Sequence, residues 1–308
     1  ICIRYRSKPI KFLIFLLSSQ FFTEYCWIDW IFNRLLAMQF SQFADYHTHT
    51  PLCRHAEGNP VDYAKRAIEI GLDEIGFSDH SPMNNDGFDE WRMLKSEFPS
   101  YLQSIKDAQK ELPNIPIKLG LEVDYFEDGH EWIEELSQMA DYDYLIGSVH
   151  YIAPGFDIDN PKWIGRWSGI AEVEDIWESY WRIYTSCIKS GFFDILAHPD
   201  LPKKFGHRPS GSLKRFYDPA IEAAKEADVC IEINTAGWRK DCNEQYPEKE
   251  FLEMMLEAEI PISINSDAHS PIDVGMDFEK AAKLAYEIGY NKTVRFNKRQ
   301  RTEIPFSI

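Results

Sequence analysis

The sequence predicts an α/β protein, folded as a distorted seven-stranded β/α (TIM-like) barrel. Short apolar runs alternate with amphipathic helical segments, and about seven such runs follow one another in the roughly 270 residues after Met38. Eight strands are usual in such a barrel, so a count of seven predicts a distorted one. A doubly wound open sheet is the alternative, but neither G-x-G-x-x-G nor G-x-x-x-x-G-K-[ST] occurs to support it.

Each expected strand is a short apolar run bounded by polar or turn-forming residues. Helical segments separate most of these runs, which predicts parallel βαβ units rather than hairpins. In chain order the strand candidates are Phe43–His47, Glu74–Ser78, Ile117–Val123, Tyr144–Val149, Phe193–Ala197, Val229–Asn234 and Pro261–Ser266.

The helices show start and stop signals. Asn59 is a good N-cap, Pro60 suits the first helical turn, and Gly71 ends that segment. From Glu172 to Ser190, apolar residues recur at three- and four-residue steps and form one broad face, which indicates a core helix. Further helices are expected at Pro219–Asp228, Glu248–Glu259 and Asp277–Ile288.

Composition bounds the class of protein. The 308 residues are 44% hydrophobic and 27% charged, typical of a globular chain with a sizeable core, and the formal net charge is −17. A duplex-DNA or anionic-membrane binder usually shows the opposite charge balance, so we expect no nucleic-acid and no membrane partner. The six cysteines form no C-x-x-C pair and indicate no disulfide scaffold, which fits a cytoplasmic location.

The first 37 residues differ from the rest. They are basic and include the apolar run Phe12–Leu17, yet no run reaches the ~20 apolar residues that span a bilayer. We expect residues 1–37 to be an extension outside the native fold, with translation starting at Met38 and one domain at 38–308. A targeting or membrane-surface segment is the alternative.

Seven of the nine histidines follow the predicted strands. His47 and His49 are two residues apart, so in an extended chain both side chains lie on one face and reach the same metal ion. The other members of this set occur in similar contexts further along the chain. They are His55, His80, His150, His198 and His269.

Two carboxylates complete the pattern. Glu122 lies in an otherwise apolar strand, where a buried carboxylate is costly unless it is paired or bound to metal, and Asp267 follows the last strand. Strand ends form the active-site face of a β/α barrel. Nitrogen and oxygen ligands without thiolate suit zinc, iron or manganese, among which the sequence does not choose.

These motifs resemble the polymerase-and-histidinol-phosphatase (PHP) superfamily of metallo-phosphoesterases over residues 42–270. The resemblance depends on His47-Thr48-His49, Ser78-Asp79-His80, Gly120–Glu122, Ser148–His150, Ala197-His198-Pro199 and Ser266–His269. Within the superfamily, His49–His55, Gly120–Tyr125 and Ser148–His150 are most similar to the histidinol-phosphate phosphatases. The family fold is a distorted seven-stranded barrel that holds up to three metals.

The resemblance implies a ligand set and a reaction. His47, His49, Glu122 and Asp267 would hold the first of three divalent ions. Glu122 would bridge to a second ion with His150 and His198, and His55, His80 and His269 would hold the third. A hydroxide bridging two metals would attack phosphorus, so Glu122 and Asp267 act in catalysis as ligands. Asp79 would orient a ligand imidazole or cap a loop.

Basic residues near these motifs are candidates for binding phosphate. Lys203, Lys204, His207 and Arg208 follow His198, and their cluster is either a phosphate site or a solvated loop. Lys204 is the first choice because the histidinol-phosphatase relatives are similar there. Arg166 lies in Tyr151–Ile170, read as a long structureless segment and therefore a binding loop. Arg208 completes the predicted contacts.

The sequence thus predicts a metal-dependent phosphomonoesterase acting on a small phosphorylated substrate, by resemblance L-histidinol phosphate in histidine biosynthesis. Three divalent ions would outweigh the ligand carboxylates, so even an acidic protein can hold a positive pocket. One alternative is a PHP-family phosphoesterase acting on nucleotides or nucleic-acid ends. Another is a non-catalytic, metal-stabilised binding module. The sequence leaves the oligomeric state open.

Overall fold

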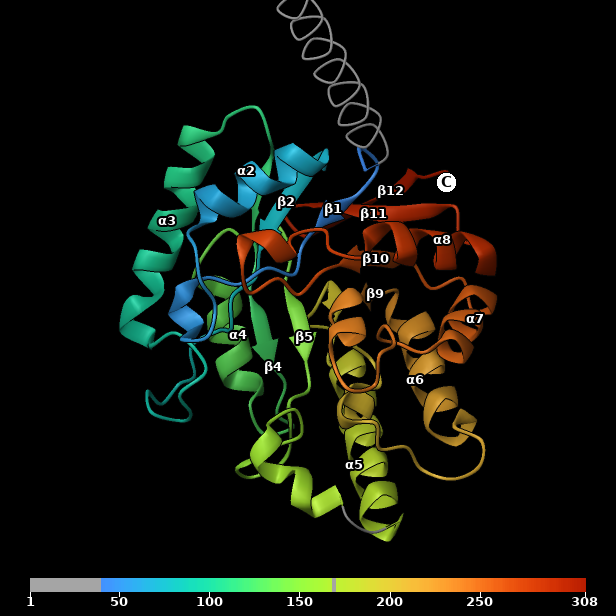
Figure 1. The fold of residues 1–308 in the computed structure, drawn as a ribbon. Coiled ribbons are helices and arrows are strands. Elements are labelled where there is room, and N and C mark those ends of the chain that lie inside the picture. The colour runs from blue at the N-terminus through green and yellow to red at the C-terminus, as the bar shows by residue number, and fades with distance from the viewer. Residues whose placement is uncertain (1–39, 168–169) are drawn as a thin grey trace, which may run out of the picture.

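The computed structural model describes residues 40–167 and 170–308 (Figure 1). Its central strands run parallel and carry helices on their outer side, so the predicted α/β class with parallel strands is confirmed. The expected extension at residues 1–37 lies outside the described residues. Within the described part of the chain, every helix is too short or too polar to cross a bilayer.

The parallel strands form two sheets. The first has the order β1 (Ala44–Asp45), β2 (Glu74–Phe77), β3 (Ile117–Leu119), and the second β10 (Ile262–Asn265), β9 (Cys230–Asn234), β8 (Ile195–Leu196), β5 (Ile146–Ser148), β4 (Glu122–Asp124). Isolated parallel bridges link the two sheets, Thr48–Ala268 beyond the ends of β1 and β10 and His80–Glu122 between the end of β2 and β4. Over the described residues the ladders therefore form two bridged sheets and not one closed sheet.

All seven predicted strand segments contain a strand, but Ile117–Val123 was wrong as a single strand. It divides into β3, which pairs with β2, and β4, which pairs with β5. The break includes Gly120, where a Cβ atom would lie 2.5 Å from the ring of Tyr144. Only glycine lets the chain pass this close to the tyrosine, and the chain changes sheets at that point.

The helices agree with the prediction except at one boundary. α2 (Pro60–Ile70) begins with the Asn59 capping box and ends at Gly71 in the left-handed region. α5 (Ile170–Lys189), α7 (Lys249–Glu257) and α8 (Phe278–Ile288) match as well. α6 (Lys214–Ala227) starts before the expected Pro219, because buried Phe216 and Tyr217 extend its apolar face. The helices α3 (Phe98–Glu111) and α4 (His130–Gln138) were not among the expected helices.

The segment after His150 is not structureless, so that expectation was wrong. It forms an antiparallel pair, β6 (Tyr151–Ala153) and β7 (Phe156–Asp157), followed by the 3-10 helix η3 (Pro161–Trp167). Buried Phe156 and Ile158 anchor it to the core. The other 3-10 helices are η1 (Pro51–Cys53), η2 (Lys95–Glu97), η4 (Leu201–Phe205), η5 (Thr235–Arg239) and η6 (Pro271–Asp273).

The C-terminal hairpin of β11 (Lys292–Asn297) and β12 (Gln300–Pro305) was not predicted. Its two turn residues, Lys298 and Arg299, have φ values of 49° and 64°. Such turns favour glycine and asparagine. Because Lys298 and Arg299 are neither, the usual sequence signal of a hairpin was missing.

Alternate residues along the strands pack into two apolar clusters. Leu145, Leu196 and Ile231 join the large core beneath the helices. Their neighbours in sequence face the other way and form a small inner cluster with Tyr46, Tyr144 and Phe296. Packing on both faces makes the strands a rigid support for the residues at their ends.

Candidate metal centre

The predicted ligands gather at one edge of the parallel strands. Because the strands are parallel, their carboxyl ends meet at that edge. Glu122 differs slightly from expectation, since it is the first residue of β4, directly after the break that ends β3. His47 and His49 follow β1, His55 follows η1, His80 follows β2, His150 follows β5, His198 follows β8, and Asp267 and His269 follow β10.

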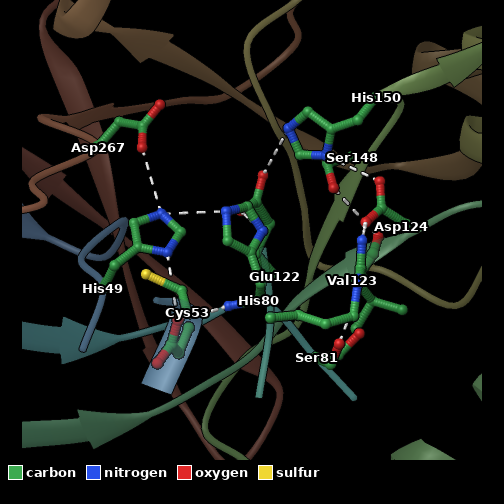
Figure 2. A network of polar contacts seen from close by, with 12 residues as sticks. His49, Cys53, His80, Ser81, Glu122, Val123, Asp124, Ser148, His150 and Asp267 are labelled. Carbon is green, nitrogen blue, oxygen red and sulfur yellow. Dashed lines mark hydrogen bonds and ion pairs between the residues drawn. The ribbon is translucent and has the colours of Figure 1, made fainter. Parts of the chain in front are cut away.

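Glu122 is buried and lies among five imidazoles, of which Figure 2 shows those of His49, His80 and His150. Burial opposes its ionisation, but the neighbouring charges of His80, His47 and His150 hold the pKa of this carboxyl well below its usual value. Its two oxygens face different histidines, as a bridging ligand requires. Oε2 is 2.9 Å from His80 Nδ1, 3.3 Å from His47 Nε2 and 3.7 Å from His49 Nε2, and Oε1 is 3.1 Å from His198 Nε2 and 3.5 Å from His150 Nε2.

Asp267 completes the group around the first two histidines. Its Oδ1 lies 3.2 Å from His49 Nε2 and 3.7 Å from His47 Nε2. The residue has φ 53°, in the left-handed region that non-glycine residues rarely adopt and that is concentrated at functional sites. Potential ligand atoms of His47, His49 and Asp267 lie within 4.8 Å of one another.

His80 and two further imidazoles form a second compact group. Potential ligand atoms of His55, His80 and His269 lie within 4.8 Å of one another, and the rings of His55 and His269 stack with centroids 4.6 Å apart. Burial and the neighbouring His80 and His49 lower the pKa of His55 to about 4, and the pKa of His269 is also lowered, by burial and by His49. Neutral imidazole is the form that binds metal.

Several ligand atoms are buried without a hydrogen-bond partner among the described residues. They include His47 Nε2, His49 Nε2, Glu122 Oε2 and His269 Nε2. Leaving a buried polar group unpaired costs about 1–3 kcal/mol, and a divalent ion bound between these atoms would remove that cost. The side chains therefore fit a metal. Cys53 also lies near His49 and His269, but burial raises the pKa of its thiol and keeps it protonated.

Carboxylates orient several of the imidazoles. His150 Nδ1 lies 2.7 Å from Asp124 Oδ1 (Figure 2), and His47 Nδ1 lies 3.1 Å from Glu232 Oε2. Asp79 lies 3.5 Å from the ring of His49 and not against the ring of its neighbour His80. Sequence reasoning missed Asp124 and Glu232. The signal used for Glu122, a carboxylate in a buried strand, would have found both.

Seven of the nine predicted ligands line a cleft of about 460 Å³, and buried His47 and His49 lie outside its lining. Lys204, one predicted phosphate contact, also lines it, and its Nζ donates to the carbonyl oxygen of Asp159 at 2.7 Å. Two cations that sequence reasoning missed lie in the same lining: Arg239 at the end of η5, and Lys240. The cleft therefore combines a metal-ligand cluster with cationic side chains, as a phosphate site requires.

The other two predicted phosphate contacts are placed differently. Arg208 forms ion pairs with Glu244 and Glu248 and lies outside the residues that line the cleft. Arg166 belongs to η3, but its side chain lies outside the described residues.

Three comparisons place this chain among known proteins. The sequence profile described as the PHP domain matches residues 45–236. A protein of Deinococcus radiodurans named "Probable histidinol-phosphatase" is 35% identical over 257 residues, which cover 83% of this chain and 97% of the relative. The histidinol-phosphatase of Bacillus subtilis is 28% identical over 264 residues, which cover 77% of this chain and 97% of that protein. The crystal structure of Lactococcus lactis histidinol phosphate phosphatase with zinc, L-histidinol and phosphate has a TM-score of 0.70 at 20% identity, covering 85% of this chain and 99% of the other.

Proposed function

Because the chain belongs to the PHP domain family, we propose that it is a metal-dependent phosphomonoesterase that hydrolyses L-histidinol phosphate to L-histidinol and phosphate. One observation carries the chemistry: the Glu122 carboxylate lies within 3.7 Å of five imidazoles at the base of a cleft with cationic walls. The substrate is inferred from the relatives, which match this chain over nearly their whole length and are named for histidinol phosphate.

The proposal assigns nine ligand positions to three divalent ions. The first group consists of His47, His49, Glu122 and Asp267, the second of Glu122, His150 and His198, and the third of His55, His80 and His269. The short contacts of both Glu122 oxygens support its bridging role, and the compact third group supports a separate ion. Zinc in the Lactococcus structure, together with nitrogen and oxygen ligands here, favours zinc, with iron and manganese as alternatives.

The protein's own contribution is to hold and orient these groups. Bound divalent ions would acidify a water molecule and stabilise negative charge on phosphate oxygens. Glu122 and Asp267 supply negative charge that fixes the ions, and Asp124 keeps the Nδ1–H of His150 directed away from the cleft. No side-chain nucleophile is required, because water is the attacking group in this proposal.

Lys204 is our proposed contact for the substrate phosphate. It lines the cleft and forms an ion pair with Asp159, a pairing that a phosphate dianion can outcompete. Arg239 lines the cleft as well and carries a buried Nη1 without a hydrogen-bond partner among the described residues. The pairing of Arg208 with two glutamates favours a structural role for that residue. Arg166 stays a prediction.

Three further proposals concern the barrel, the domain and the location of the protein. The bridges Thr48–Ala268 and His80–Glu122 support closure of the two sheets into the distorted seven-stranded barrel, with β3 and β4 as one interrupted strand. The domain of residues 38–308 remains our proposal for the folded unit. Free, buried thiols at Cys187 and Cys230 support a cytoplasmic location.

A phosphate-release panel tests the proposal. Metal-loaded protein is assayed with L-histidinol phosphate, nucleoside monophosphates, serine phosphate and a 3′-phosphorylated oligonucleotide. We expect kcat/KM for L-histidinol phosphate to exceed the others by at least about a hundredfold. Preference for a nucleotide or the oligonucleotide would contradict the substrate, and no release from any ester by protein with bound metal would contradict catalysis.

A further inference from the structure

Glu232 is a fully buried carboxylate in the middle of β9, surrounded by hydrogen-bond donors. A buried charge is costly unless its oxygens are satisfied, and here four donors reach them. The donors are the imidazole of His47 (Nδ1, 3.1 Å from Oε2), the backbone N–H of His198 (2.7 Å from Oε1), and the side-chain amides of Asn234 (2.8 Å from Oε1) and Asn265 (2.8 Å from Oε2).

These donors connect Glu232 to both groups that share Glu122. His47 belongs to the first group and His198 to the second, so one carboxylate holds a side chain of one and the backbone of the other. Asn234 also donates to Asp267 Oδ2 at 3.2 Å, which extends the network to the second carboxylate of the first group. A shift of Glu232 would therefore change the spacing between the two groups.

The contact also determines which nitrogen of His47 faces Glu122 and Asp267. An ionised carboxylate only accepts hydrogen bonds, so His47 Nδ1 must donate to it. In the neutral imidazole that binds metal, the lone pair then lies on Nε2, which is 3.3 Å from Glu122 Oε2 and 3.7 Å from Asp267 Oδ1. Such outer carboxylates typically change metal affinity by 10–100-fold when they are removed.

We infer that Glu232 is the positioning residue of this metal centre: it fixes the orientation of His47 and joins it to the backbone of His198, so that two ions bind at a set separation. The inference rests on the proposed function for the presence of ions, but it concerns residues outside the nine ligands.

The all-donor surroundings specify a carboxylate at this position. A glutamine would place its NH2 group against at least one amide or imidazole donor, because four donors already face the two oxygens of Glu232. The double variant E232Q/N265D would remove the conflict at position 265, and His47 Nδ1, which lies 3.2 Å from Oε1, could donate to the remaining oxygen. The carboxylate that N265D introduces could accept from the new glutamine NH2 at one oxygen. It could also accept from the hydroxyl of Ser263 and from the backbone N–H of Tyr46, which already donates to Asn265 Oδ1.

The test measures zinc affinity of the metal-free protein by competition with a chromophoric chelator at fixed pH, with unfolding temperature measured in parallel. We expect E232Q to weaken two binding steps by about 10–100-fold and the third by less than about threefold. The variant H55Q, which lacks a ligand of the third group, identifies that third step. E232Q/N265D should recover at least tenfold of the loss.

Glu74→Gln is the matched control, because Glu74 is also a buried carboxylate, it accepts from the Tyr46 hydroxyl, and it lies at the opposite end of β2 from His80. The zinc affinity of the E74Q variant should equal that of the wild type, even if the unfolding temperature of the variant falls. If E232Q does not fold, E232D replaces it, with about tenfold weaker binding expected at the same two steps.

Affinity of E232Q or E232D within about twofold of wild type would overturn the inference, as would an equal loss in E74Q or no recovery in the folded double variant. Failure of the proposed function is a distinct result, since the wild-type protein itself would then bind no zinc or release no phosphate.

Discussion

Adding zinc to the metal-free protein at pH 7 should expel protons from the first two ligand groups and not from His55 or His269. Burial opposes charge on His49, but the nearby carboxylates of Asp267, Asp79 and Glu122 raise its pKa to about 9. Burial likewise opposes charge on His150, but Asp124 and Glu122 raise its pKa to about 10. Both imidazoles are therefore in the doubly protonated, cationic form at pH 7, and a metal ion must displace the second proton.

The pKa values set the size of the effect. Removing the proton at pH 7 costs about 3 kcal/mol at His49 and about 4 kcal/mol at His150, since each pKa unit corresponds to about 1.4 kcal/mol. His47, whose pKa is also raised because Glu232, Asp267 and Glu122 outweigh its burial, adds a third proton. A raised pKa keeps these imidazoles protonated at pH 7, and zinc must compete with the protons. Zinc affinity should therefore rise with pH, about tenfold per pH unit for each proton released, until pH passes about 9–10.

Titration calorimetry in two buffers of different ionisation enthalpy counts these protons. We expect about three protons released when all the groups fill, and about two for a His150→Asn variant. H55Q should leave the count unchanged, because the lowered pKa of His55 leaves that ring neutral. The control His130→Gln removes a histidine outside the cluster and should also change nothing. Release of less than one proton, or an affinity that stays flat between pH 7 and 8, would refute the reasoning.

The site also predicts the effects of removing single side chains or the metal. Glu122→Gln should reduce phosphate release below about 1% and lower the bound-metal count, and full activity in a steady-state assay would contradict its bridging role. Removing the metal with a chelator should lower the unfolding temperature by roughly 10 °C for each ion whose free concentration was a thousandfold above its Kd. An unfolding temperature that calorimetry finds unchanged would show that metal binding does not stabilise the fold. Lys204→Ala should raise KM at least about tenfold, while KM of Arg208→Ala stays within about twofold of the wild-type value. A larger rise in KM for Arg208→Ala than for Lys204→Ala would instead make Arg208 the phosphate contact. Trp91 lines the cleft and is 44% exposed, so Trp91→Ala should raise KM for L-histidinol phosphate several-fold but not for serine phosphate, and equal effects would exclude ring contact.

The strand ends could be predicted from sequence because each depends on a local signal. An apolar run followed by histidine or aspartate identifies both the strand and the residue beyond it, as with His150 after β5 and Asp267 after β10. Parallel connectivity then brings these ends together without further information. This is why the sequence alone could predict that His47, Glu122 and the other predicted ligands lie together.

Features that depend on a partner elsewhere in the chain were not predicted. Gly120 splits a strand because Tyr144 lies against it, and nothing near residue 120 encodes that ring. Glu232 and Asp124 carry the signal of a carboxylate in a buried strand, but which imidazole each one contacts, His47 or His150, depends on the fold. Arg208 was chosen for its proximity in sequence to Lys204, but η4 and the following turn direct it to Glu244 and Glu248 instead.

Anomalous diffraction from zinc-loaded crystals, recorded on both sides of the zinc absorption edge, tests the central claim most directly. The account predicts three peaks in the cleft, two of them in contact with Glu122 and the third among His55, His80 and His269, with zinc–nitrogen distances of about 2.0–2.1 Å. A loaded crystal with no peak within reach of Glu122, or with zinc only at surface sites, would contradict the three-ion centre and the chemistry proposed for it.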